Sequence, residues 1–171
     1  GFLDIEKSIT LLSSADLVGA ENEKLKPLFL AGQGRIWTLE GNLLAAKNCF
    51  DKAYASIVEM NTNNLEESEI ISYVKYELGL FYDVLIDFER AFTLFEEASH
   101  LANSRVLHTL ISYQTEILKA KSNKSYKLRS LRKYIKFFEA ESSPITVVLS
   151  LHRLGALHRR NGDYNEASDY F

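Results

Sequence analysis

Histidine and carboxylate side chains are the first candidates for chemistry in this sequence. The four histidines are His100, His108, His152 and His158, and no two of them are four residues apart, the spacing that places two metal ligands on one helix face. Glu97 and His100 form one Glu-x-x-His half-motif, whereas a di-iron helix bundle needs two half-motifs and further carboxylates. We therefore predict that the chain holds no metal and no cofactor.

Nucleophilic residues are also present without the partners that would activate them. Cys49, the single cysteine, has no histidine near it in the sequence and stands next to Phe50, where packing is expected. No serine lies in a nucleophile-elbow context, and no glycine-rich phosphate loop occurs. We predict that the chain is not an enzyme. A lone cysteine cannot form an intramolecular disulfide, which favours a reducing, cytoplasmic location.

A spacing of small and aromatic residues recurs three times along the chain. Counting from Gly79, Tyr82 follows at +3, Asp87 at +8, Ala91 at +12 and Phe95 at +16. Equivalent residues follow Gly34 and Gly155 at the same steps, namely Trp37, Asn42, Ala46 and Phe50 in the first copy and His158, Asp163, Ala167 and Phe171 in the third. Three copies of one spacing indicate an internal repeat.

Each copy of the spacing predicts two antiparallel helices packed closely together. The glycine of the first helix and the alanine of the second allow the backbones to approach, and the aromatic residue fills the space beside that contact. Gly41 and Gly162 mark the turns, since glycine adopts the left-handed conformation that ends a helix, and the Asn or Asp that follows caps the second helix. The middle copy has Ile86 in place of the glycine.

This pattern resembles the tetratricopeptide repeat (TPR), a helix-turn-helix unit. Further matching residues are Ala53, Leu78, Ala98, Leu154 and Tyr164. The resemblance implies an all-α fold, a right-handed α-α superhelix of TPR-like repeats that serves as a scaffold for protein binding. The longer spacing between copies is similar to that in kinesin light chains, in peptide-pheromone receptors and in the sensor arms of transcription activators of the maltose-regulator type.

The repeats divide the chain into successive pieces of a single domain. We predict a half repeat over 1–24 and repeats over about 27–61, 66–102, 105–141 and 144–171, of which the repeat over 105–141 is divergent and the last is truncated. The predicted helices are 27–39, 42–59, 66–84, 87–102, 105–119, 126–139, 144–159 and one that starts at 163. Because both ends cut through a repeat, we expect the chain to be a fragment of a longer array.

Composition excludes some classes of partner. The 171 residues are 46% hydrophobic and 25% charged, which is ordinary for a globular domain, and the net charge of -3 disfavours a nucleic-acid-binding surface. A local basic cluster is interpreted as a solvated helix face: Lys121, Lys124, Lys127, Arg129, Arg132, Lys133 and Lys136. No apolar run approaches the length of a membrane span, so we expect no membrane partner.

The remaining candidate for function is the face that the first helices of the repeats would present to a concave groove. The residues predicted there are Arg35, Thr38, Tyr73, Tyr76, Leu80, Asp83, Thr109, Tyr113, Glu116, His152 and Arg159. The three tyrosines combine apolar area with a hydroxyl group, as binding residues often do, although they could equally pack between repeats. The Lys, Asn and Arg residues with which some TPR proteins clamp a carboxylate are absent.

This mixed apolar and aromatic surface favours an amphipathic helix or an extended peptide as the ligand. We therefore predict a non-catalytic module that binds another protein or peptide. The alternative is a ligand-sensing or peptide-sensing arm of a larger signalling or transcription-regulator protein. The oligomeric state stays open.

Overall fold

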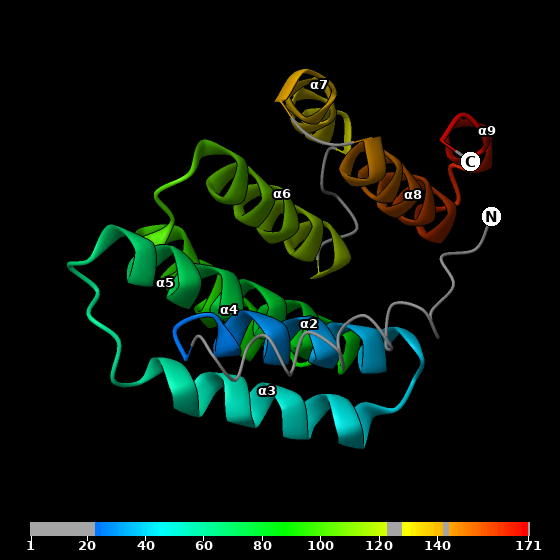
Figure 1. Cartoon of the computed structure of the whole chain (residues 1–171). Helices are drawn as coiled ribbons and strands as arrows, with labels where there is room; N and C mark the ends of the chain where they lie inside the picture. The colour runs from blue at the N-terminus through cyan, green and yellow to red at the C-terminus, as the bar shows by residue number, and fades with distance from the viewer. Residues whose placement is uncertain (1–22, 123–127, 142–143, 171) are drawn as a thin grey trace. The chain divides into compact units, whose positions relative to one another are not determined.

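The computed structural model describes residues 23–122, 128–141 and 144–170, and within these ranges it contains helices and no strands (Figure 1). The α-helices are α2 (Lys26–Leu39), α3 (Leu43–Ile57), α4 (Leu65–Val84), α5 (Phe88–Leu101), α6 (Arg105–Ser122), α7 (Arg132–Glu141), α8 (Pro144–Asn161) and α9 (Tyr164–Ser168), and a 3-10 helix, η1 (Leu128–Leu131), precedes α7. The all-α prediction is confirmed. Most of the half repeat predicted over 1–24 lies outside the described residues.

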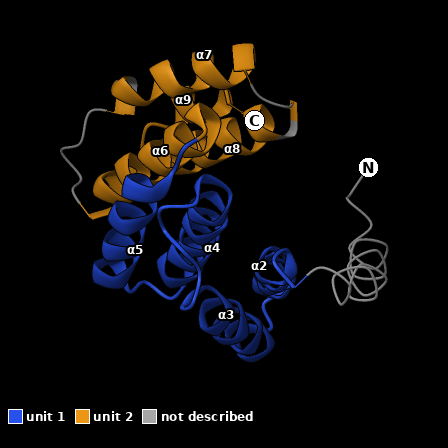
Figure 2. Ribbon diagram, turned by 60° about the vertical axis from the view of Figure 1, so that its left-hand side comes forward, with its two compact units in different colours: residues 1–103 blue, residues 104–171 orange. Residues whose placement is uncertain are grey.

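The chain divides into two compact units, with the boundary between Asn103 and Ser104 (Figure 2). Unit 1 contains α2 to α5, and unit 2 contains α6 to α9 with η1. The boundary falls between the repeats predicted over 66–102 and 105–141. None of the helices in the described ranges is both long and apolar enough to cross a membrane.

In unit 1 the helices pack as two pairs, α2 with α3 and α4 with α5, and α4 also lies against both helices of the first pair. A Cβ atom added to Gly34 would stand 2.9 Å from the ring of Phe50, and one added to Gly79 would stand 2.6 Å from the ring of Phe95. The predicted glycine–aromatic contact is thus confirmed in the first two copies. In the third copy, Phe171 lies outside the described residues.

The turns of the three copies share one backbone geometry. Gly41, Ile86 and Gly162 have left-handed φ angles of 78°, 62° and 86°. The next residue in each turn (Asn42, Asp87 or Asp163) donates its backbone N–H to the carbonyl five residues earlier, at 2.9, 3.0 and 3.0 Å. This bond closes a Schellman motif, which satisfies carbonyls at the end of the first helix. The predicted turns are therefore present, including the one without glycine.

The helix that follows each turn begins at the predicted capping residue. The side chain of Asn42 accepts a hydrogen bond from the backbone N–H of Ala45 at 3.1 Å, and that of Asp87 accepts one from Arg90 at 3.3 Å. These bonds satisfy N–H groups that have no partner within the helix. Asp163 makes no such side-chain bond to α9.

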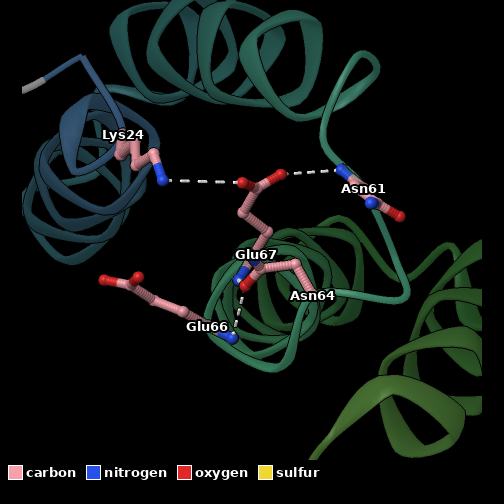
Figure 3. A network of polar contacts seen from close by, with 5 residues as sticks. All are labelled: Lys24, Asn61, Asn64, Glu66 and Glu67. Carbon is pink, nitrogen blue, oxygen red and sulfur yellow. Dashed lines mark hydrogen bonds and ion pairs between the residues drawn. The ribbon is translucent and has the colours of Figure 1, made fainter.

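Polar side chains at the start of α4 fix the loop that joins the two pairs of unit 1 (Figure 3). Asn64 caps α4 by accepting from the N–H groups of Glu66 and Glu67. The carboxylate of Glu67 accepts the backbone N–H of Asn61 at 2.7 Å and lies 3.7 Å from Nζ of Lys24, before α2. Glu67 thereby connects the start of α4 both to the loop after α3 and to the residues just before α2.

Unit 2 contains two further helix pairs, α6 with η1 and α7, and α8 with α9, and α8 also lies against α6 and α7. Its core contains Tyr113, Leu131, Phe138 and Leu154, each with no exposed surface. The prediction of one helix over 126–139 is wrong in its first part, because a 3-10 turn over Leu128–Leu131 precedes α7. Leu128 and Leu131 are both buried, and the three-residue period of a 3-10 helix places them on one side.

Candidate functional site

Two of the predicted binding residues of unit 1 come together where α2 and α4 are adjacent. Nε of Arg35 on α2 lies 3.9 Å from Oε2 of Glu77 on α4, and Tyr73 precedes Glu77 by one helical turn. The side chains of Arg35 and Glu77 are 24% and 9% exposed, and Tyr73 is half-buried. We call Arg35, Tyr73 and Glu77 the α2–α4 cluster.

The electrostatics of the α2–α4 cluster keep Tyr73 neutral. The negative charge of Glu77 is the main cause, and burial and a hydrogen bond to the same carboxylate add to it, so that the pKa of Tyr73 is raised above its ordinary value of about 10. The positive charge of Arg35 lowers the pKa of Tyr73, but by less than Glu77 raises it. The O–H of Tyr73 donates to Glu77, so the guanidinium of Arg35 is the group of the cluster that can donate to an acceptor on a ligand.

Glu77 was not among the residues predicted from sequence. Its position one turn after Tyr73 on the same helix face was the available signal. The prediction missed it because a carboxylate is seldom buried unless it is paired, and the partner, Arg35, comes from a different repeat.

Three other predicted residues of unit 1 are buried. Thr38 is 7% exposed, and its hydroxyl donates to the carbonyl of Gly34 at 2.7 Å. Tyr76 is 6% exposed, with ring centroids 6.4 Å from Tyr73 and 6.0 Å from Phe95. Leu80 is 4% exposed. Asp83, the last predicted residue of this unit, is half-buried near the end of α4.

Tyr113 of unit 2 is a core residue. It has no exposed surface, its hydroxyl donates to the carbonyl of Ser150 at 2.6 Å, and its ring packs edge-on against Phe138 with 5.7 Å between centroids. Of the two roles that the sequence left open for the tyrosines, binding or packing, Tyr113 therefore has the packing role.

The other predicted residues of unit 2 lie on two helices and are more accessible. On α6, Thr109 donates to the carbonyl of Arg105 at 2.8 Å, and Glu116 accepts from Lys119 at 2.8 Å. On α8, His152 and Arg159 are exposed.

A second surface of unit 1 was missed from sequence. A groove of about 890 Å³ runs between α3 and α5, and α4, which contacts both helices, forms its floor. Tyr54 of α3 and Val58, the residue that caps the end of α3, line it and are 41% and 68% exposed. Both lie off the buried stripe of α3, which is Phe50, Ala53 and Ile57. Apolar residues outside that stripe were the signal that could have revealed the groove.

Neither surface has the residues of a metal centre. Within the described residues, no group of three or more His, Cys, Asp or Glu side chains is placed to hold a metal ion. The α2–α4 cluster offers hydrogen-bond donors and an aromatic ring, and the groove offers apolar side chains with charged ones at its edge.

The chain was also compared with known proteins. Models of protein families, curated proteins and solved structures gave no match. The resemblance to tetratricopeptide repeats therefore depends on the repeated residues and on the local geometry that they adopt.

Proposed function

We propose that the chain is a non-catalytic protein–protein interaction module built of TPR-like helix pairs, and that the α2–α4 cluster binds a partner peptide or helix. The observation that carries the proposal is the convergence of Arg35, Tyr73 and Glu77, from the first helices of two successive repeats, at a partly exposed position. A ligand that spans successive first helices is what a TPR-like groove would accept.

The repeat geometry supports a TPR-like arrangement within each unit. Three turns share a left-handed residue and a Schellman bond, and two glycines meet the aromatic residue of the paired helix. In both units the first helix of the second pair lies against both helices of the first pair, α4 against α2 and α3, and α8 against α6 and α7. We infer from this neighbour relationship that the two helix pairs of each unit stack as successive TPR-like repeats would.

The guanidinium of Arg35 is a donor group in the α2–α4 cluster that a ligand could engage. Charge-assisted hydrogen bonds are about 2.7–2.9 Å long, so the 3.9 Å contact with Glu77 engages Arg35 only weakly. A guanidinium has five N–H donors in a planar fork, which suits the carboxylate or backbone carbonyls of a peptide. The Tyr73 ring supplies apolar area beside it.

The lone cysteine, Cys49, fits a reducing, cytoplasmic setting for such an interaction.

The proposal is tested by co-precipitation with the whole chain from a lysate of its source, followed by titration of each purified partner by calorimetry. We expect Arg35→Ala and Tyr73→Ala each to weaken binding of a specific partner at least tenfold. Lys52→Ala, which changes an exposed cation on α3, is the matched control and should leave the affinity unchanged.

Equal affinity for all of these variants would place binding away from the cluster and refute the proposal. If only a small molecule binds, and binding depends on Arg35, the sensory-arm alternative is favoured instead. Circular dichroism of each variant shows whether the fold is retained.

A further inference from the structure

The groove between α3 and α5 is separate from the α2–α4 cluster and has its own chemistry. It uses Leu78 and Tyr82 of α4, whereas the cluster uses Tyr73 and Glu77. At 100° per residue, these two pairs lie on different faces of the helix. A ligand in the groove therefore does not need the residues on which the proposed function depends.

The apolar residues of the groove are spaced by single helical turns. Tyr54 and Val58 are four residues apart on α3, and Leu78 and Tyr82 are four residues apart on α4. Residues at this spacing form ridges on a helix, and helices pack by fitting the ridges of one between those of another. The groove between α3 and α5 thus offers a third helix the exposed apolar side chains of Tyr54 and Val58. They stand above a floor of Leu78, which is 9% exposed, and Tyr82, which lies under Arg90.

Acidic side chains predominate along the groove. Its lining includes Asp51, Asp87, Glu89 and Glu97 against the single cation Arg90. Arg90 lies 3.3 Å from Asp87 and above the ring of Tyr82, 5.4 Å from its centroid.

The lysines beside the groove change this balance only in part. Nζ of Lys75 pairs with Glu97 and lies 5.9 Å from the ring centroid of Tyr54. The side chain of Lys75 is 16% exposed and that of Glu97 is 45% exposed, so the negative member of the pair is the one that meets solvent. Lys47, which pairs with Asp51, is as exposed as its partner, at 57% against 60%. Arg90, in contrast, is more exposed than its partner Asp87, at 67% against 36%. Four carboxylates therefore face three cations, and the groove edge carries an excess of one negative charge.

We propose that the α3–α5 groove binds an amphipathic helix of a partner protein whose apolar stripe is flanked by Lys or Arg residues. The apolar stripe would pack on Tyr54 and Val58, and the basic residues would lie beside the acidic edge. Charge complementarity of this kind selects among partners and accelerates association. This interaction goes beyond the proposed function, because it uses a different surface and a ligand of defined charge.

The test uses the whole chain and a display library of 18-residue helical peptides with randomised surface positions. We expect selection to enrich peptides with an apolar stripe and a net positive charge. Val58→Asp should weaken the enriched peptides at least tenfold, measured by fluorescence anisotropy. Leu44→Asp is the matched control, because Leu44 is 82% exposed on the same helix and does not line the groove.

The outcome separates this proposal from the function at the α2–α4 cluster. Loss of binding with Val58→Asp, together with affinity within twofold of the original for Leu44→Asp and Arg35→Ala, supports the groove. The proposal is overturned if no helical peptide is enriched, if the enriched peptides are acidic, or if they bind Val58→Asp as well as the original chain. Both Asp variants replace exposed residues, and circular dichroism verifies that each remains folded.

Discussion

Ile86 adopts in the α4–α5 turn the left-handed conformation that Gly41 adopts in the α2–α3 turn, with φ angles of 62° and 78°. In both turns the following residue donates its N–H to the carbonyl five residues earlier. A β-branched residue in this conformation is strained, because its Cβ approaches the carbonyl oxygen. The packing of the two helices thus imposes the turn even where the sequence lacks the glycine that favours it.

Replacement of Ile86 by glycine is expected to stabilise the chain. The left-handed conformation costs a non-glycine residue about 1–2 kcal/mol, and glycine returns about 0.5–1 kcal/mol of that through its greater entropy in the unfolded chain. Because Ile86 is 74% exposed, little burial is lost. We expect the free energy of unfolding to rise by about 0.5–1 kcal/mol in urea denaturation. Ile86→Ala, which retains a Cβ, should give no such gain, and an equal gain would show that the strain is absent.

Replacement of Gly79 by alanine is expected to destabilise unit 1. The new Cβ would stand 2.6 Å from the Phe95 ring, so the ring or one of the helices must move. Overpacking of this kind costs about 1–3 kcal/mol. The double variant Gly79→Ala with Phe95→Leu should lose less than the two single variants combined, because the smaller side chain gives the Cβ room. Additive losses in thermal denaturation would contradict the contact.

Removal of the Tyr113 hydroxyl is expected to cost stability without loss of aromatic packing. Tyr113→Phe leaves the buried carbonyl of Ser150 without the 2.6 Å hydrogen bond that it accepts. Because Ser150 lies within α8, its carbonyl keeps its helical hydrogen bond, and the loss is that of one further hydrogen bond, about 0.5–1.5 kcal/mol. Chemical denaturation should show this loss, whereas Tyr54→Phe, at a residue that is 41% exposed, should be close to neutral. A neutral Tyr113→Phe would mean that the hydroxyl is not bonded in the folded chain.

The raised pKa of Tyr73 predicts a loss of stability at alkaline pH. Folding favours the neutral phenol because Glu77 lies beside it, so the contribution of Tyr73 is complete below its unfolded pKa of about 10 and is lost as the pH rises towards its folded pKa. We expect Tyr73→Phe to reduce the fall in stability between about pH 9 and 11, as measured by urea denaturation at each pH. Glu77→Gln removes the negative charge that is the main cause of the raised pKa, so it should also reduce the fall in stability over this pH range. An unchanged pH profile in both variants would exclude the interaction.

Much of the helical framework could be predicted from local spacing. Gly34 and Gly79 identified the close contacts with Phe50 and Phe95, and Asn42 and Asp87 identified the starts of helices within one residue. These features depend on residues close together in sequence, and backbone geometry limits each of them to few solutions. The superhelical stacking and the binding function remain proposals.

The sequence by itself determined most of the helices, the three turns and the glycine–aromatic contacts of the two helix pairs of unit 1. Only the tertiary structure decided which side chains reach the surface. The face predicted from sequence included Tyr113, which is wholly buried, and omitted Glu77 and the α3–α5 groove. The physical reason is that periodicity assigns a residue to one side of its own helix, whereas its exposure depends on which neighbouring helices cover that side.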